Sequence, residues 1–283
     1  MSGLALPLQL FSVKIYPGLM LDRLEKTADK DWKLKGVKYL GDMAGRRVVP
    51  TEAGDQTKER ILSAAEQLFA KSGFDGVSMR DIGRTAEVPF ALITYHFQSK
   101  LGLYQALFRR RQDLLTTQRL QRLHEVQMTG DREADIRQIA AAIVDPMINI
   151  RSLPGGLDFT RLIAREICDP MESERGIVAE YLDPVAFAAL ELLERVAPHV
   201  DYEQICWAFY FASGSLAINN ANTGRVERLS SGKCQTSDTS HVATMLTTFI
   251  AAAWDGMLST NKGQQKRSQA RARRSPQQRK KLV

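Results

Sequence analysis

The segment from Thr57 to Leu107 constrains the fold of this chain most strongly, because it contains three short helical patterns in a row. Its sequence is TKERILSAAEQLFAKSGFDGVSMRDIGRTAEVPFALITYHFQSKLGLYQAL. Only a tight turn separates the second pattern from the third. This spacing is typical of a helix-turn-helix, a motif that places one short helix in the major groove of DNA.

The first helix is predicted over about residues 57–72. Its apolar residues fall at i, i+1, i+4, i+7 and i+8, which forms one stripe on a helix: Ile61, Leu62, Ala65, Leu68 and Phe69. Gly73 follows at the position where a left-handed residue would end the helix.

The second helix is predicted to begin after Ser78, which forms a capping-box variant with Asp81. It should turn Met79, Ile82 and Ala86 toward the core. Pro89 ends it, because proline lacks the N–H and restricts the residue before it. A third helix then runs from Pro89 through Ile93 to about His96, and Phe97 holds it to the core.

The third helix carries an exposed face of mixed chemistry, followed by Ser99 and Lys100. Hydroxyl, imidazole and ammonium groups suit phosphate oxygens, whereas small or flat side chains suit base edges. The residues on this face are Phe90, Ala91, Thr94, Tyr95 and His96. Spacing alone leaves a second interpretation open, a three-helix bundle without a ligand, because helix-turn-helix elements recur in unrelated α-proteins.

The residues of this segment resemble the DNA-binding domain of the TetR family of transcriptional regulators over about one fifth of the chain. The matching motifs, in order, are Ile61-Leu62-x-Ala64-Ala65-x-x-Leu68-Phe69, Gly73-Phe74, Ser78-Met79-Arg80-Asp81-Ile82, Ala86-x-Val88 and Tyr95-His96-Phe97-x-Ser99-Lys100-x-x-Leu103-Tyr104. Tyr95-His96-Phe97 with Pro89 ahead of it is similar to the CecR-like branch of that family.

The resemblance implies a role for each site residue. Phosphates would be held by Ser78, Tyr95, His96 and Lys100, joined by Arg80. Base edges would lie closest to Phe90, Ala91 and Thr94. Structural alternatives remain for three of them: Ser78 as a helix cap only, Tyr95 as a packing residue, and Phe90 as a staple against the preceding helix.

Two departures from the family pattern affect this site. Glu87 stands where the family usually has glycine, which places an acid near the DNA backbone. Phe90 and Leu92 replace more polar residue types, so the bases that are read stay undefined.

The net charge of +7 belongs to the C-terminal end of the chain. Nine of the 39 basic residues follow Asn261, where no acid occurs, so residues 1–261 carry 30 basic and 32 acidic residues, a net charge of −2. The nine are Lys262, Lys266, Arg267, Arg271, Arg273, Arg274, Arg279, Lys280 and Lys281. Residues 261–283 are therefore predicted to be a disordered basic tail. Such a tail either adds nonspecific, salt-sensitive DNA contacts or has no specific role.

Composition argues against a disulfide framework, a metal site and a membrane span. The three cysteines are odd in number and lack C-x-x-C spacing, which indicates reduced residues of a cytoplasmic protein. The four histidines lie far apart, so no metal or other cofactor is expected. The longest uncharged run, near residues 242–254, is too short to cross a bilayer.

Residues 1–54 are interpreted as an N-terminal extension, disordered or lying upstream of the true start. We expect translation to begin at Met43, directly ahead of the DNA-binding domain. Arg46 and Arg47 would then lie on a mobile arm that could reach the minor groove.

From Leu101 onward the pattern is helical, with neither strand alternation nor repeats, so the predicted fold class is all-α. The predicted domains are 55–115 for DNA binding, with the helix-turn-helix at about 79–98, and 116–260 for ligand binding and dimerisation. We expect a long linking helix toward Val126, then helices over 131–150, 159–167, 175–196 (interrupted at Asp183-Pro184), 202–222 and 241–258, with a loop over 224–239.

The last two of these helices are apolar over too wide an arc for one covered face, which indicates a second surface to bury. Members of the family dimerise through two late helices, and Trp207, Phe211, Phe249 and Trp254 make this pair the candidate interface. Burial within one chain is the alternative.

The resemblance also implies a small-molecule effector in a cavity between helices of the C-terminal domain. Polar candidates near such a cavity are Arg161, Arg165, Glu166, His124 and Asn219. Internal ion pairing or dimer contact is the preferred role for these groups, so no ligand residue is assigned.

The predicted function is a sequence-specific DNA-binding regulator, a cytoplasmic homodimer that represses from a palindromic operator until an effector releases it. An enzyme is disfavoured because no nucleophile–base pair, Gly-rich phosphate loop or metal spacing occurs. A DNA-organising protein that binds nonspecifically through its basic tail is the remaining alternative.

Overall fold

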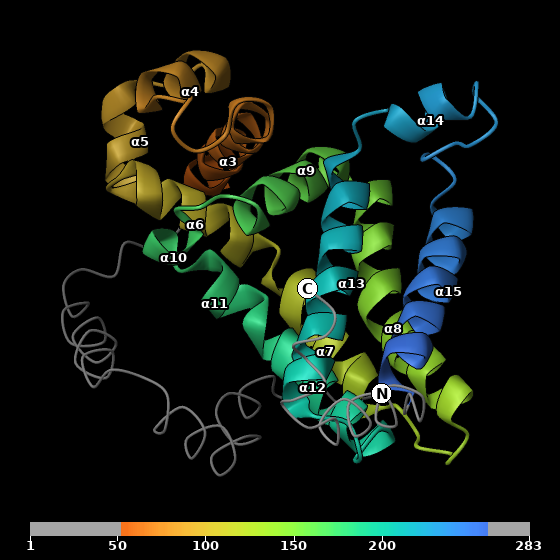
Figure 1. Ribbon diagram of the computed structural model, residues 1–283. Coiled ribbons are helices and arrows are strands. Elements are labelled where there is room, and N and C mark those ends of the chain that lie inside the picture. Colours follow the sequence, from red (N-terminus) through yellow and green to blue (C-terminus); the bar gives the residue numbers. More distant parts are fainter. Residues whose placement is uncertain (1–51, 260–283) are drawn as a thin grey trace, which may run out of the picture. The chain divides into compact units, whose positions relative to one another are not determined.

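A computed structural model describes residues 52–259, and these residues form helices and connecting turns without a strand (Figure 1). The predicted all-α class is confirmed. The expectations for residues 1–51, including a start at Met43 and an arm with Arg46 and Arg47, lie outside the described residues, as does the basic tail after Asn261.

Three helices form the predicted helix-turn-helix region: α3 (Glu52–Ser72), α4 (Met79–Ala86) and α5 (Phe90–Phe97). Their shared core is apolar and fully enclosed, because the stripe on α3 meets the inner faces of α4 and α5. Its buried members include Ile61, Ala65, Phe69, Ile82, Ala86, Ile93 and Phe97. Met79, expected inward, is half-buried against this core.

The predicted end of the first helix and start of the second are confirmed, whereas α3 begins at Glu52, ahead of the start predicted near Thr57. Gly73 has a φ of +73° and its N–H donates to the Phe69 carbonyl at 2.8 Å, which closes α3. Ser78 Oγ accepts from the Asp81 N–H at 3.1 Å, and the Ser78 N–H donates to the Asp81 carboxylate at 3.1 Å. This reciprocal capping box begins α4.

The predicted linking helix toward Val126 is wrong as one continuous α-helix. It is divided into α6 (Lys100–Arg110), a π-helix η2 (Asp113–Thr117) and α7 (Gln118–His124). The α-helix stops at Arg111, whose backbone leaves the helical region at φ −110° and ψ 14°. Its side chain binds groups on two other segments, described below.

The C-terminal helices surround a second part of the core. They are α8 (Arg132–Asn149), the 3₁₀-helix η3 (Ile150–Ser152), α9 (Gly156–Ile167), α10 (Glu172–Arg175), α11 (Ile177–Tyr181), α12 (Asp183–Val196), α13 (Tyr202–Ala221), α14 (Arg225–Leu229) and α15 (Thr239–Leu258). Pro146 lies inside α8, within the helix predicted over residues 131–150.

Two C-terminal predictions need correction. The helix expected from Arg175 to Val196 breaks at Gly176, which has a φ of +69°, as well as before Asp183. The segment 224–239, expected to be a loop, contains the short helix α14. There Glu227 accepts from the Thr236 N–H at 3.0 Å, which folds the segment back on itself.

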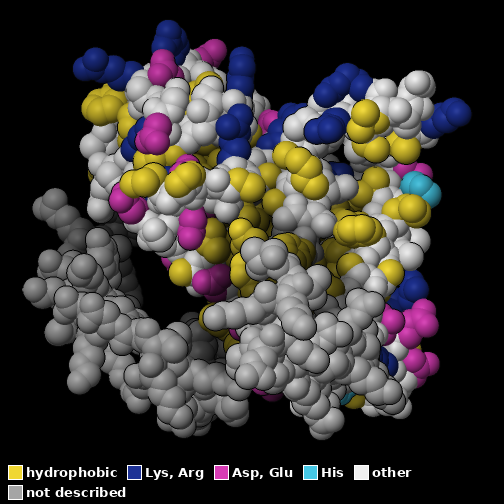
Figure 2. Space-filling view, viewed as in Figure 1, with side chains coloured by type: hydrophobic (Ala, Val, Ile, Leu, Met, Phe, Trp, Pro, Cys, Tyr) yellow, Lys and Arg dark blue, Asp and Glu magenta, His cyan; other side chains and the backbone are white. Residues whose placement is uncertain are grey.

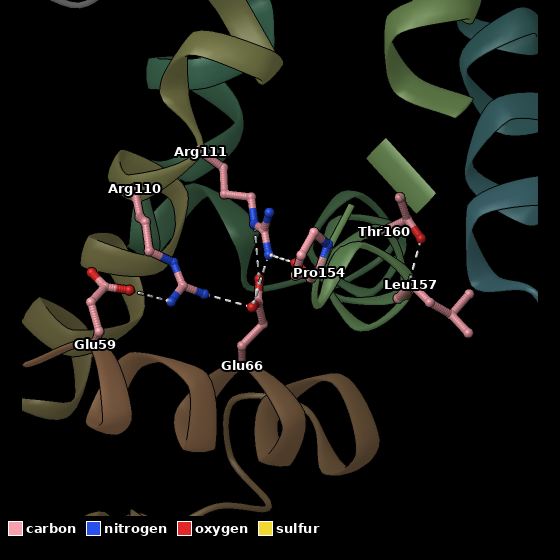
Figure 3. Close-up of polar contacts among 7 residues, drawn as sticks. All are labelled: Glu59, Glu66, Arg110, Arg111, Pro154, Leu157 and Thr160. Atoms are coloured by element: carbon pink, nitrogen blue, oxygen red, sulfur yellow. Dashed lines mark hydrogen bonds and ion pairs between the residues drawn. The ribbon is translucent and has the colours of Figure 1, made fainter. Parts of the chain in front are cut away.

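A buried ion-pair cluster joins the helix-turn-helix region to the rest of the chain. Glu66 of α3 is 3% exposed and accepts from Arg110 at 2.5 Å and from Arg111 at 3.2 Å. Arg111 also donates to the Pro154 carbonyl at 2.9 Å, so one guanidinium connects α3 to the turn before α9 (Figure 3). Gly155 in this turn has a φ of +68°, which favours glycine, and an added side chain would also lie 3.0 Å from the ends of Arg111 and Glu66.

Two further contacts fix α9 beside α3 and α6. Arg165 of α9 donates to the carbonyls of Ala70 and Lys71 at 2.8 and 2.9 Å, which caps the C-terminal end of α3. The Tyr104 hydroxyl of α6 donates to Glu166 at 2.9 Å, and Arg175 binds the same carboxylate at 2.9 Å. Burial and the neighbouring carboxylate raise the pKa of Tyr104, so this hydroxyl stays protonated as the donor.

Glu66→Ala should lower the free energy of unfolding by about 3 kcal/mol, because it leaves two largely buried guanidinium groups without their carboxylate. The measurement is urea denaturation followed by circular dichroism. The matched control is Glu59→Ala, since Glu59 pairs with Arg110 at 3.2 Å but its side chain is 60% exposed. Equal effects of the two variants would contradict a structural role for the cluster.

Candidate DNA-binding site

Helix α5 presents one face to solvent and the opposite face to the core. Phe90 and Tyr95 are 51% and 65% exposed, whereas Ile93 and Phe97 are buried. Ala91 and Thr94 are exposed on the same side as Phe90 and Tyr95. The outer face therefore presents apolar, hydroxyl and aromatic groups together. These side chains are exposed, and the described part of the chain does not cover this face.

The polar groups at the end of α5 have distinct surroundings. The Tyr95 and His96 rings meet edge to face, with centroids 5.2 Å apart. Thr94 donates its hydroxyl to the Phe90 carbonyl at 3.2 Å, which leaves its oxygen lone pairs toward solvent. Lys100 is half-buried, and its Nζ lies 4.5 Å from the centre of the Phe74 ring. Its ammonium thus stacks on an aromatic ring at the edge of the exposed face.

The start of α4 supplies a second group of polar side chains. Ser78 and Arg80 are exposed, and Asp81 pairs with Arg84. The pKa of the Asp81 carboxyl lies below its ordinary value, because it accepts hydrogen bonds from the hydroxyl and the amide of Ser78 and faces Arg84. The Ser78 hydroxyl donates to Asp81 at 2.6 Å while accepting from the backbone. Its role as a cap is confirmed; its contact with phosphate stays a prediction.

The turn between α4 and α5 depends on a strained residue and a glycine. Glu87 ends α4 in the left-handed region, with φ 54° and ψ 47°. A side chain at Gly83 would come within 3.0 Å of the Val88 carbonyl and 3.2 Å of Ile93. Gly83 therefore allows α5 to pack closely on α4.

Arg60 holds this turn from α3. Its Nη2 donates to the carbonyls of Ala86 and Glu87 at 2.7 and 3.0 Å, which satisfies the last carbonyls of α4. Neither Arg60 nor Gly83 was among the predicted site residues. A glycine inside a helical pattern was the available signal for Gly83, whereas the sequence gives no signal for Arg60.

The eight predicted site residues lie on α4, α5, the cap before α4 and the start of α6. Six are exposed and two, His96 and Lys100, are half-buried. Their roles toward phosphates and bases stay predictions. Lys and Arg side chains over this region alternate with acidic ones (Figure 2), in keeping with the small net charge of the chain before its tail.

A second candidate surface lies on α13 and α15. Six large apolar side chains are 50–67% exposed there: Trp207, Tyr210, Phe211, Ile218, Met245 and Phe249. Trp207 stacks on Phe211 with ring centroids 5.7 Å apart. Hydrophobic side chains are visible over both helices in Figure 2. A side chain at Gly214 would meet nothing within 4 Å, so packing within this chain does not require glycine there.

Trp254 does not belong to this surface, and its prediction as an interface residue is wrong. It is 1% exposed, and its indole N–H donates to the Ala208 carbonyl at 3.0 Å. The apolar arc of α15 was wide because α8 and α13 both cover it.

An effector cavity in the C-terminal domain stays a prediction. Between α8, α13 and α15 the hollow measures about 20 Å³, while an open groove of about 1570 Å³ lies between α3, α9 and α13. Glu166 and Arg161 form the internal ion pairs preferred for them, with Arg175 at 2.9 Å and Asp158 at 3.5 Å. Arg165 instead donates to the backbone carbonyls of Ala70 and Lys71.

Neither a metal cluster nor a membrane span occurs in the described part of the chain. Within residues 52–259 no group of three His, Cys, Asp or Glu side chains could hold a metal ion. None of the helices in that range is long and apolar enough to cross a bilayer.

Two family models match the chain. The model described as "Bacterial regulatory proteins, tetR family" matches residues 61–107, and that described as "Tetracyclin repressor-like, C-terminal domain" matches residues 141–253. The first covers the helix-turn-helix and the second covers the helical bundle. The CecR-like branch stays a prediction.

Individual relatives match over short segments of the chain. The probable HTH-type transcriptional regulator YttP of Bacillus subtilis is 43% identical over 51 residues, 18% of this chain and 25% of that protein. The negative regulator IcaR of the Staphylococcus aureus biofilm operon icaADBC is 35% identical over 48 residues, 17% and 26% of the two chains. The chain thus spans about a quarter of the length of these curated relatives. A crystal structure of a TetR-like regulator from Rhodococcus sp. RHA1 aligns over 75% of this chain and all of its own, with a TM-score of 0.49 and 18% identity.

Glu87→Gly should be about 1 kcal/mol more stable than Glu87→Ala, because only glycine adopts the left-handed region without steric cost. Thermal unfolding of the two variants measures this difference. The pair separates backbone strain from charge, since both variants remove the carboxylate. Equal melting temperatures would show that the turn relaxes when the glutamate side chain is lost.

Proposed function

This chain belongs to the TetR family of bacterial regulatory proteins, and we propose that it is a sequence-specific DNA-binding transcriptional regulator that represses as a homodimer. The exposed face of α5 carries this proposal. Its inner face is fixed to α4 by Gly83 and Arg60, so the outer face is presented rigidly. A short rigid helix with a mixed apolar and polar face fits the DNA major groove.

In this proposal one set of residues contacts phosphates and a second set contacts bases. Ser78, Tyr95, His96 and Lys100, with Arg80, bind phosphates and set the register of the helix. Phe90, Ala91 and Thr94 face the base edges. The Thr94 hydroxyl oxygen, whose hydrogen is donated to the Phe90 carbonyl, suits a base amino group, and the apolar groups suit thymine methyls.

The apolar surface on α13 and α15 supports the homodimer. Six exposed apolar side chains on two adjacent helices form a surface that a second copy would cover. The open space at Gly214 allows a helix of that copy to approach closely. Two recognition helices would then read half-sites about 34–36 Å apart on a palindromic operator, or a multiple of that spacing.

A small-molecule effector would release the operator in this proposal. It does so only if it binds more tightly to a conformation in which the two recognition helices no longer match the groove spacing. A regulator of this kind works where the chromosome is, so we place the protein in the cytoplasm.

Fluorescence anisotropy across a salt series tests DNA recognition, with DNA from upstream of the protein's own gene compared with a shuffled sequence. We expect selective binding with a steep salt slope. Tyr95→Ala should weaken operator binding about tenfold, because two half-sites each lose a phosphate hydrogen bond.

The control for Tyr95→Ala is Phe187→Ala, which removes a 42%-exposed aromatic side chain from α12. Unchanged operator affinity of Tyr95→Ala would remove this residue from the phosphate set.

The cluster of basic residues after Asn261 favours a second candidate, nonspecific DNA binding through the tail. A chain ending at Asn261 separates the two, since loss of all binding would support the tail and retained selectivity would exclude it.

The double variant Phe211→Glu/Ile218→Glu should be monomeric by light scattering and bind the operator poorly, because two charges enter an apolar interface. Both side chains are more than half exposed in the single chain, so folding should be retained. Phe187→Glu on α12 is the matched control. A dimeric double variant would place the interface on another surface.

A further inference from the structure

Arg119 of α7 is a cation in the core without a counter-ion. The residue is 5% exposed, and its Nη1 donates to the Leu115 carbonyl of its own helical segment at 3.1 Å. Its Nε is buried without a hydrogen-bond partner. Among the ion pairs formed within residues 52–259, none includes Arg119.

This environment differs from that of the other buried arginine. Arg175 is 6% exposed, but it pairs with both Glu166 and Asp169 at 2.9 Å. Burial lowers the pKa of Arg119 to about 10, so the guanidinium is still charged at neutral pH. Because a buried unpaired charge is costly, folded proteins rarely keep one that only packs.

Arg119 also adjoins an irregular helical turn. The π-helix η2 immediately precedes α7 and contains Leu115, whose carbonyl accepts from Arg119. Single π-turns within α-helices are rare and occur often at functional sites. This turn lies between α6, which packs on α3 and α5, and α7, which packs on α8 and α12. A group that binds Arg119 therefore acts on the connection between the DNA-binding helices and the bundle.

We propose that Arg119 is the recognition point for the carboxylate of the effector, and that the effector is a small organic acid with an apolar body. This inference rests on the proposed function, which supplies the effector. Arg119 gives a bidentate partner for a carboxylate. Its helix α7 packs on α8 and α12, whose buried apolar side chains would contact the apolar body of the ligand.

The packing of the bundle explains how such a ligand would act on DNA binding. Arg119 is 5% exposed, and its helix packs on α8 and α12. An organic acid can therefore reach the guanidinium only in a conformation with a more open bundle. Its carboxylate would draw the guanidinium away from Leu115 in η2. Differential affinity for this second conformation is the requirement for allosteric release.

Thermal unfolding with unbranched carboxylates of six to fourteen carbons, and with benzoate and phenylacetate, tests the proposal. The matching alcohols serve as neutral controls. At about 100 times Kd, a carboxylate that binds should raise the Tm of the full chain by about 5–10 °C, and its alcohol should have little effect. Arg119→Met should abolish this shift, and without ligand it should melt about 3 °C or more above the unsubstituted protein. Arg119→Lys keeps the charge and should retain part of the shift.

The matched control is Arg122→Met, which removes another α7 cation whose side chain is 48% exposed and lies 3.7 Å from Asp145. It should leave the carboxylate shift unchanged. The proposal is overturned if no carboxylate of the series stabilises the protein, or if Arg119→Met responds like the unsubstituted chain. A lower Tm of Arg119→Met without ligand would also overturn it, since Arg119 would then hold the fold.

Operator binding separates this inference from the proposed function. Arg119→Met should bind the operator normally, while the stabilising carboxylate should weaken operator binding by the unsubstituted protein at least about tenfold and spare the variant. A protein that binds no operator but shows the Arg119-dependent shift would retain the carboxylate site and lose the proposed function.

Discussion

The buried carboxylate of Glu66 is the interaction on which the rest of this structure depends. It projects from the middle of α3, the helix that supports α4 and α5, and receives both Arg110 and Arg111. Because Arg111 also reaches the Pro154 carbonyl, the position of α9 follows from that of α3. Desolvating three charges is costly, and the pairing offsets this only when the geometry is kept. The contact therefore acts as a fixed joint.

The rigid position of the recognition helix α5 depends on a strained backbone at the turn before it. Gly83 and the left-handed backbone of Glu87 allow α5 to pack against α4. Arg60 donates hydrogen bonds to the carbonyls at that turn. A strained non-glycine residue persists only where its surroundings determine its conformation. Here the surroundings are two hydrogen bonds from α3. The exposed face of α5 thus takes its orientation from α3 and from the turn, while its own side chains stay free for DNA.

The local elements of this fold could be predicted from sequence, and the long-range ones could not. The capping box at Ser78, the left-handed Gly73 and the apolar stripe of α3 depend on residues within one or two turns. The break at Arg111 depends on Glu66 and Pro154, which are 45 and 43 residues away. Trp254 was misplaced for the same reason, because an apolar arc does not show whether a neighbour in the same chain or a second chain covers it. The exposed face of α5 followed from periodicity, whereas Arg60 acts across 26 residues.

The buried polar contacts between helices limit where conformational change can occur. Three sets of contacts connect α3, α6, α9 and α10 into one block. They are Glu66 with Arg111, Arg165 with the end of α3, and Tyr104 with Glu166 and Arg175. A movement of the recognition helix relative to the bundle must then carry α9 with it, since opening any joint would expose an unpaired buried group. The block can shift at the π-turn η2 and at the packing of α9 on α13. Small residues such as Ala164 and Ala217 line an open groove at the second place. Both lie beside surfaces proposed here for a ligand and a second copy, so either event can reposition α5 without breaking the block.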